Sequence, residues 1–181
     1  MTQYDVIITD PPWSYYGSQT KWAAAGKEYQ TMPDADLLDW EYPLTKNGIL
    51  FMWATCPRLD FAIHCIEKLK LHYRGVSFVW VKTRADGKPI GAQGVRPSIT
   101  KPLVELVLAA SPRPTGRPLK LHDESICQTV LAPRGEHSQK PEDVQDRIER
   151  MYPEATKAEF FARRHRQGWT CFGNELPLAE S

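Results

Sequence analysis

Short apolar runs that alternate with helical segments are the feature of this sequence that most limits its fold. Residues 49–53 (Ile-Leu-Phe-Met-Trp) are apolar on both faces, which is typical of a buried parallel strand. We expect strands at Tyr4–Thr9, Gly48–Ala54, Val76–Lys82, Leu103–Ala109, Ile126–Leu131, Ala158–Ala162 and Trp169–Phe172. The pattern predicts an α/β fold with a mostly parallel seven-stranded sheet that helices cover on both faces.

The segments between these strands have either helical periodicity or the composition of loops. Apolar residues recur at helical spacing in Pro57–Leu71, which predicts a helix there. An early proline followed by acidic residues predicts two more helices, at Pro33–Trp40 and Pro141–Met151. Long loops are expected at Ser14–Thr31, Arg84–Lys101 and Ser111–Ser125, and loops of this length in a small domain are usually functional.

Length and composition limit the class of protein. A chain of 181 residues with 41% hydrophobic residues is long enough for one domain with a substantial core. The net charge of +1 excludes a polybasic binder but is compatible with a nucleic-acid enzyme that has a local basic rim. No apolar run reaches the ~18–20 residues of a membrane span, no secretory signal is recognisable, and the four cysteines are scattered. We expect a single domain over residues 1–181, cytoplasmic and without membrane contact.

The first expected strand leads directly into the tetrapeptide Asp10-Pro11-Pro12-Trp13. Ligands of open α/β sheets bind at the carboxyl ends of the strands, so a site is expected here. Asp10 provides a carboxylate, Pro11 a carbonyl on a backbone stiffened by two rings, and Trp13 a flat apolar face. Two fixed acceptors suit the two N–H donors of the exocyclic amine of a nucleobase, and an aromatic face suits an unstacked base. The alternative is a turn with a packed tryptophan.

This tetrapeptide resembles the signature of S-adenosylmethionine-dependent amino-methyltransferases. The whole chain is similar to the MT-A70 family, which includes the catalytic subunit of the messenger-RNA adenine-N6 methyltransferase. The segments that carry the resemblance are Tyr29–Met32, Gly48–Trp53, Val79–Thr83, His137–Glu142, Phe160–Arg163, Gly168–Trp169 and Gly173–Glu175. The resemblance implies a Rossmann-like methyltransferase fold in permuted order, with the catalytic motif before the cofactor motif. Only three residues precede the first strand, so we expect the C-terminal third to supply the cofactor site.

The resemblance also implies the cofactor and the residues that contact it. The cofactor is S-adenosylmethionine, the product is S-adenosylhomocysteine, and no metal is involved. A lysine beside a helix N-terminus suits a carboxylate, and Lys140 is expected to contact the methionine part of the cofactor. Phe161 is expected either to stack on the cofactor adenine or to pack in the core. The implied cofactor-contacting residues are Asp10, Lys140, Phe161, Arg163, His165, Asn174 and Glu175, and Arg166 lies in the same loop.

Candidate substrate-binding residues come from the long loops. The loop after the tetrapeptide combines aromatic and basic residues, which is what an unstacked base and its phosphates need. The candidates are Tyr15, Tyr16, Lys21 and Trp22 in that loop and Arg96 in the next long loop. A surface loop whose composition has no functional meaning is the alternative.

Two other observations concern charged and metal-ligating residues. Glu105 interrupts an apolar strand, and an acid in that position is rare unless it is paired, so we expect a structural ion pair. His64, His72 and His122 have no partner at metal-ligand spacing, so no metal site is predicted.

The sequence thus predicts an enzyme that transfers a methyl group from S-adenosylmethionine to the exocyclic N6 amine of adenine in nucleic acid, with DNA preferred. The Asp10-Pro11-Pro12-Trp13 motif would be catalytic. Alternatives are the same reaction on RNA, a cytosine-N4 DNA methyltransferase, or a non-catalytic nucleic-acid-binding scaffold. We expect a domain of this size to lack a separate target-recognition module. We therefore expect a short, relaxed recognition sequence or a homodimer that shares the substrate surface.

Overall fold

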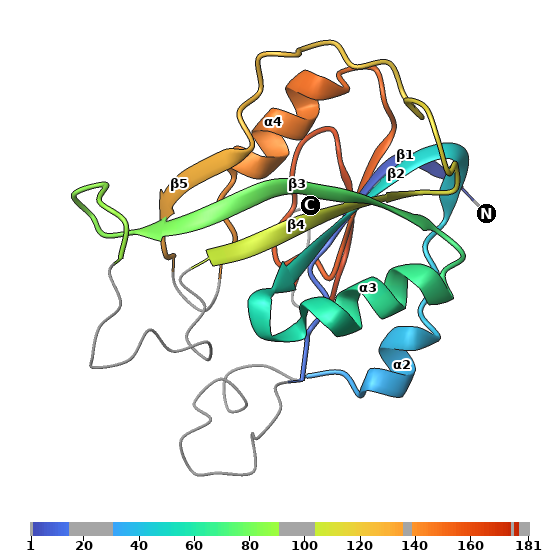
Figure 1. Ribbon diagram of the computed structural model, residues 1–181, viewed down its shortest axis with the longest axis horizontal. Helices are drawn as coiled ribbons and strands as arrows, with labels where there is room; N and C mark the ends of the chain where they lie inside the picture. Colours follow the sequence, from blue (N-terminus) through green and yellow to red (C-terminus); the bar gives the residue numbers. More distant parts are fainter. Residues whose placement is uncertain (1, 15–30, 91–103, 136–138, 175, 178–181) are drawn as a thin grey trace.

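A single twisted sheet of seven strands organises the molecule (Figure 1). The computed structural model describes residues 2–14, 31–90, 104–135, 139–174 and 176–177. The strands are β1 (Tyr4–Thr9), β2 (Leu44–Thr55), β3 (His72–Thr83), β4 (Val104–Ser111), β5 (Thr129–Pro133), β6 (Lys157–Phe160) and β7 (Thr170–Phe172). Their order across the sheet is β5-β3-β4-β2-β1-β6-β7.

The pairing of the strands confirms the prediction of a mostly parallel sheet. β1 is parallel to both of its neighbours, β2 and β6, and the outer pairs β3–β5 and β6–β7 are parallel too. β4 alone runs antiparallel to its two neighbours, β2 and β3. The amino-terminal end of β4 therefore lies at the same edge of the sheet as the carboxyl ends of the other strands.

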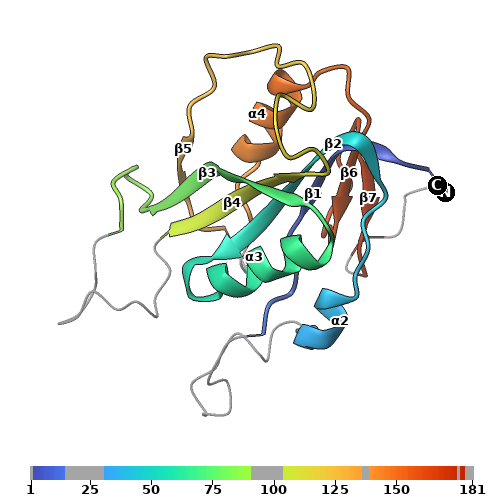
Figure 2. The same cartoon turned by 45° about the vertical axis from the view of Figure 1, so that its right-hand side comes forward.

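Helices cover both faces of the sheet, as predicted (Figure 2). The helices α2 (Asp34–Leu38) and α3 (Leu59–Lys68) lie on one face, and α4 (Asp143–Met151) lies on the other. A 3₁₀ turn at Cys56–Arg58 precedes α3. Alternate residues of the strands face the two layers, because successive side chains of a strand point to opposite sides. In β1, Ile7 packs with the α3 layer, whereas Val6 and Ile8 pack with the α4 layer.

Several boundaries differ from the sequence expectations. β2 and β3 each run for 12 residues and begin before the expected segments. β6 ends at Phe160 rather than Ala162, because Phe161 has a left-handed backbone with φ of 60°. The helix expected from Pro57 becomes regular only at Leu59.

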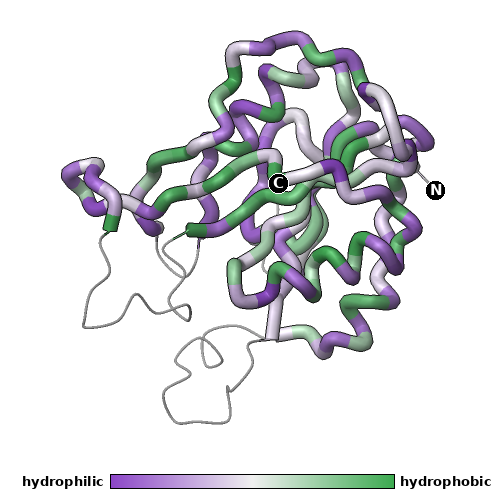
Figure 3. Tube along the Cα trace, in the orientation of Figure 1, coloured by the Kyte–Doolittle hydropathy of each residue, from purple (hydrophilic) through white to green (hydrophobic). Residues whose placement is uncertain are grey.

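The core lies along the central strands. Figure 3 shows apolar residues concentrated along the sheet and polar residues on the surrounding loops and on α4. Within the described ranges, no helix has the length and apolar character that a membrane crossing requires. The strand ends near β1, β2 and β6 are the part of the fold that positions the candidate site.

Candidate active site

A cavity of about 360 Å³ lies at the carboxyl ends of β1 and β6, beside the start of α4. Thr9 pairs with Phe160 in the register of these strands, so the residues that follow the two strands emerge side by side. The sequence-predicted residues Asp10, Lys140, Phe161 and Arg163 all line the cavity. The structure therefore brings together the residue after the first strand and the C-terminal segment that was expected to bind the cofactor.

Other predicted residues lie elsewhere. His165 is exposed, and its Nε2 lies 3.1 Å from the carbonyl oxygen of Pro177. Asn174 is exposed in a turn after β7 and is not among the residues that line the cavity. Arg166 also does not line the cavity and instead binds acids of α4. The candidates Tyr15, Tyr16, Lys21, Trp22, Arg96 and Glu175 lie outside the described residues.

Alternating charges extend from the cavity into the sheet. The Nζ of Lys140 lies 2.9 Å from Oδ2 of Asp10 and 3.2 Å from Oε2 of Glu105. The other carboxylate oxygen of Glu105 accepts a hydrogen bond from Nζ of Lys82 at 2.5 Å. Glu105 is buried, so this pairing confirms the expected ion pair in β4. The ion pair between Glu105 and Lys140 connects this pair to the tetrapeptide.

Burial and pairing change the pKa values of these groups in different directions. Burial raises the pKa of Asp10 above its ordinary value, although the cation of Lys140 opposes the shift. Burial also raises the pKa of Glu105, but the cations of Lys140 and Lys82 lower it by more. The pKa of Glu105 therefore lies below its usual range. The two carboxylates raise the pKa of Lys140 against the effect of burial, so this side chain stays protonated.

The other groups of the tetrapeptide hold its conformation. The ring of Trp13 is buried against Phe61, and its indole N–H donates to the carbonyl oxygen of Trp53 at 3.1 Å. The structure does not place Trp13 at the cavity, so its face is not presented to a ligand there. The Pro11 carbonyl accepts the backbone N–H of Trp13 at 2.8 Å, and a carbonyl oxygen has a second lone pair that can accept another hydrogen bond. Of this motif, Asp10 alone lines the cavity.

The segment after the tetrapeptide is tied back to the fold at its described ends. The Ser14 hydroxyl donates to Oδ1 of Asp34 at 2.8 Å, and the same oxygen accepts from the buried guanidinium of Arg58 at 2.7 Å. The backbone N–H of Met32 donates to the Pro12 carbonyl at 3.0 Å. These bonds fix the positions of residues 14 and 32 next to the motif.

Several polar residues of the cavity wall were not singled out by the sequence analysis. Glu159 on β6, Gln145 on α4 and Arg164 after β6 all line the cavity. Burial raises the pKa of Glu159, although a hydrogen bond from Gln145 opposes the shift. The available signal was an acid within the otherwise apolar expected strand Ala158–Ala162, as Glu105 is an acid within an otherwise apolar run.

The cavity suits a ligand that carries both charges and an aromatic group. Lys140, Arg163 and Arg164 provide cations, while Asp10 and Glu159 provide carboxylates. The apolar part of the wall includes Ile8, Val144 and the ring of Phe161, which packs against Trp40 at 4.9 Å between centroids. A volume of about 360 Å³ is in the range of small-molecule sites. In the part of the chain that the structure covers, no group of His, Cys, Asp or Glu is arranged to hold a metal ion.

Comparison with known proteins agrees with this geometry. The family model described as MT-A70 matches residues 4–175. The chain is 30% identical over 194 residues to the Type II methyltransferase M.MunI of Mycoplasma sp. This match covers 97% of this chain and 78% of that protein. The chain is 27% identical to the probable N(6)-adenosine-methyltransferase MT-A70-like of Oryza sativa subsp. japonica and 25% identical to the N(6)-adenosine-methyltransferase catalytic subunit METTL3 of Homo sapiens. These two matches cover 96% of this chain but only 23% and 28% of the relatives, so the chain spans about a quarter of their length.

Proposed function

We propose a function for this chain on the basis of its family. The chain belongs to the MT-A70 family of methyltransferases. Within this family, the proposed reaction is transfer of a methyl group from S-adenosylmethionine to the exocyclic N6 amine of adenine in DNA. The observation that carries the proposal is the Asp10 carboxylate, which enters the cavity directly after β1 and lies 2.9 Å from the Lys140 ammonium.

The cavity residues fit S-adenosylmethionine. The cofactor would supply an electrophilic methyl group on a sulfonium. Lys140, next to the start of α4, would bind the carboxylate of its methionine part. Phe161 would contact the adenine, and Arg163 the polar groups between the two ends. Asn174, His165 and Glu175 remain proposed contacts, although Asn174 and His165 do not line the cavity and Glu175 lies outside the described residues.

In the proposed mechanism, Asp10 acts on the target amine. Its carboxylate would accept one N–H of the exocyclic amine, and the free lone pair of the Pro11 carbonyl would accept the other. Two fixed acceptors hold the amine in line with the methyl group and stabilise the positive charge that develops on nitrogen. Lys140 favours the ionised form of Asp10, which is the form that can accept a proton.

The base would be held by residues of the long loops, which lie outside the described residues. Tyr15, Tyr16, Lys21, Trp22 and Arg96 remain the proposed substrate-binding residues, because aromatic and basic side chains suit an unstacked base and its phosphates. The buried Trp13 is not assigned to stacking, since it supports the motif from the core.

DNA is the polymer in this proposal because M.MunI, which this chain matches along 78% of its length, is a Type II methyltransferase. RNA is the second candidate, because the plant and human relatives are named adenosine-methyltransferases. A homodimer that shares the substrate surface remains part of the proposal. The rival reaction at cytosine N4 would use the same acceptors and differs only in the base.

The test is substitution of Asp10. Asp10→Ala and Asp10→Asn should abolish methyl transfer to DNA from labelled S-adenosylmethionine. Binding of S-adenosylhomocysteine by calorimetry should persist, because Lys140 keeps Glu105 as its partner. Asp36→Ala, at an exposed position on α2, is the matched control and should transfer like wild type. Transfer by both Asp10 variants within a few-fold of wild type would refute the role of the carboxylate.

A further inference from the structure

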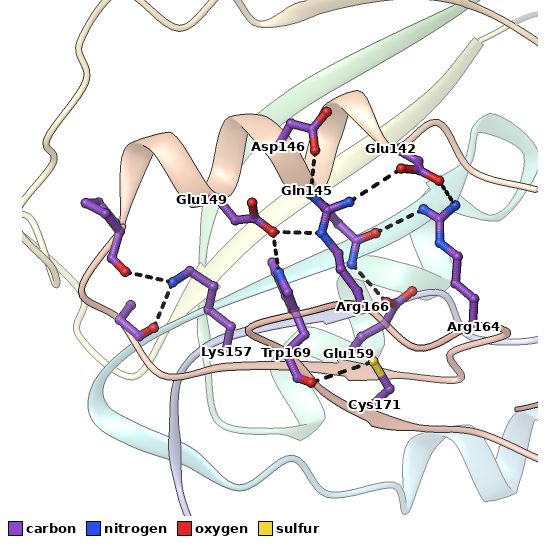
Figure 4. A network of polar contacts seen from close by, with 12 residues as sticks. Glu142, Gln145, Asp146, Glu149, Lys157, Glu159, Arg164, Arg166, Trp169 and Cys171 are labelled. Atoms are coloured by element: carbon purple, nitrogen blue, oxygen red, sulfur yellow. Dashed lines mark hydrogen bonds and ion pairs between the residues drawn. The ribbon is translucent and has the colours of Figure 1, made fainter. Parts of the chain in front are cut away.

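The loop after β6 is joined to α4 by an arginine–acid network, made of Arg164, Arg166, Glu142, Asp146 and Glu149 (Figure 4). The three acids lie at spacings of four and three residues, so they share one face at and just before α4. Arg166 reaches all three of them: its Nε donates to Oε1 of Glu149 at 2.7 Å, a terminal nitrogen donates to Asp146, and Glu142 lies 3.8 Å away.

Within this network, Arg166 is more enclosed than the arginine of an ordinary surface ion pair, although Glu142 and Asp146 are exposed. The side chain of Arg166 is only 14% exposed. Glu149 also accepts the indole N–H of Trp169 at 2.7 Å, and Trp169 is itself buried. The carboxylate of Glu149 thus fixes two points of the loop at once, which an isolated and freely rotating pair on the surface would not do.

Hydrogen bonds continue from the network into the cavity wall. Arg164 donates to Glu142 and lies 3.5 Å from Oε1 of Gln145. The amide nitrogen of Gln145 donates to Oε2 of Glu159 at 2.8 Å. Arg164, Gln145 and Glu159 all line the cavity, so the arginine on one side and the carboxylate on the other fix the orientation of the Gln145 amide.

We propose that Arg166 is a positioning residue for cofactor binding, which acts through Glu149 and Asp146 to hold the loop after β6 against α4. The inference rests on the proposed function, since it takes the cavity to be the S-adenosylmethionine site. Arg166 does not touch the cavity. Instead, it fixes the distance between two walls of the cavity. One wall bears Lys140 and Pro141, and the other bears Arg163 and Arg164.

The experiment is calorimetry of S-adenosylhomocysteine on the full chain, together with steady-state transfer. Arg166→Gln should weaken binding by roughly tenfold, equivalent to about 1.4 kcal/mol, and raise the KM for S-adenosylmethionine similarly. The kcat at saturating cofactor should stay within about twofold, because no reacting group has changed. If Arg166 acts through Glu149, the double variant Arg166→Gln/Glu149→Gln should bind about as weakly as Arg166→Gln alone.

Arg150→Gln is the matched control. Arg150 lies on the same helix and pairs with Asp123 at a distance of 2.6 Å, and neither residue lines the cavity. This variant should lose an ion pair without loss of cofactor affinity. Unchanged binding in Arg166→Gln, or equal weakening in Arg150→Gln, overturns the positioning role while the wild type still binds. Failure of the wild type to bind S-adenosylhomocysteine overturns the proposed function and the inference together.

Discussion

The ion pair between Lys140 and Asp10 offers the most informative perturbation of the site. Lys140→Met keeps the length of the side chain and removes its charge. Glu105 retains Lys82 at 2.5 Å, so its charge stays compensated. Asp10 loses the cation that most favours its ionised form, and burial then raises the pKa of Asp10 further above the ordinary value.

The size of the effect follows from the distance and the exposure of the pair. Two unit charges 2.9 Å apart attract each other by about 6 kcal/mol at an effective dielectric constant of about 20. The side chains of Lys140 and Asp10 are 18% and 25% exposed, so solvent screens part of this attraction. We take about 3 kcal/mol, at the lower end of the range for removal of one partner from a buried pair. Where pH lies below the pKa of Asp10 in both proteins, this corresponds to a roughly hundredfold smaller ionised fraction of Asp10 and an equal loss in the transfer rate.

The assay is single-turnover methyl transfer against pH at saturating cofactor, which separates the ionisation of Asp10 from any loss of cofactor affinity. In Lys140→Met, the acidic limb of the profile should move to higher pH, and the rate should recover as pH rises. Lys140→Arg keeps the charge and should keep the limb near its wild-type position. A Lys140→Met profile that superimposes on wild type would refute the reasoning.

Three further predictions concern the packing and pH response of the fold. A Cβ on Gly173 would lie 2.0 Å from the carbonyl oxygen of Ala162, so Gly173→Ala should cost about 1–3 kcal/mol in urea unfolding, and an unchanged midpoint would contradict the close approach. Burial alone would raise the pKa of Glu149, but the hydrogen bonds it accepts hold the pKa below its usual value. Its contribution to stability is therefore complete above the unfolded pKa and is lost as pH falls through the folded pKa. Glu149→Gln should be less stable than wild type at pH 7, and thermal melts of the two should converge once pH falls below the folded pKa, which lies under the ordinary value of about 4.3. Trp13→Phe leaves the buried carbonyl of Trp53 without its donor and should lower the free energy of unfolding by about 1–3 kcal/mol, whereas equal stability would show that the bond is dispensable.

Local patterns in the sequence predicted the elements better than their arrangement. The apolar run of β1 and the acid in β4 are local signals, and both led to correct conclusions about burial and pairing. The antiparallel placement of β4 between β2 and β3 depends on contacts between segments far apart in the chain, which periodicity does not encode. The early end of β6 follows from the left-handed backbone of Phe161, a conformation that its residue type does not favour.

The sequence predicted the position of those candidate-site residues that directly follow a strand. Asp10 and Arg163 follow parallel strands and line the cavity as expected from that rule. The direction of a side chain was not predictable in the same way. Trp13 turns into the core, where its indole N–H finds the backbone carbonyl of Trp53, and Arg166 turns toward α4, where it finds the carboxylate of Glu149. Such partners come from elements distant in sequence.

The central claim is that this fold methylates the N6 amine of adenine, and identification of the modified base tests it most directly. Wild-type protein and the Asp10→Ala variant would be incubated with methyl-labelled S-adenosylmethionine and with matched DNA and RNA, then digested to nucleosides for mass spectrometry. The account predicts N6-methyladenine in DNA with wild type and none with the variant. N6-methyladenine in RNA alone would keep the mechanism and change the polymer. N4-methylcytosine, or no modified base in either polymer despite cofactor binding, would contradict the account.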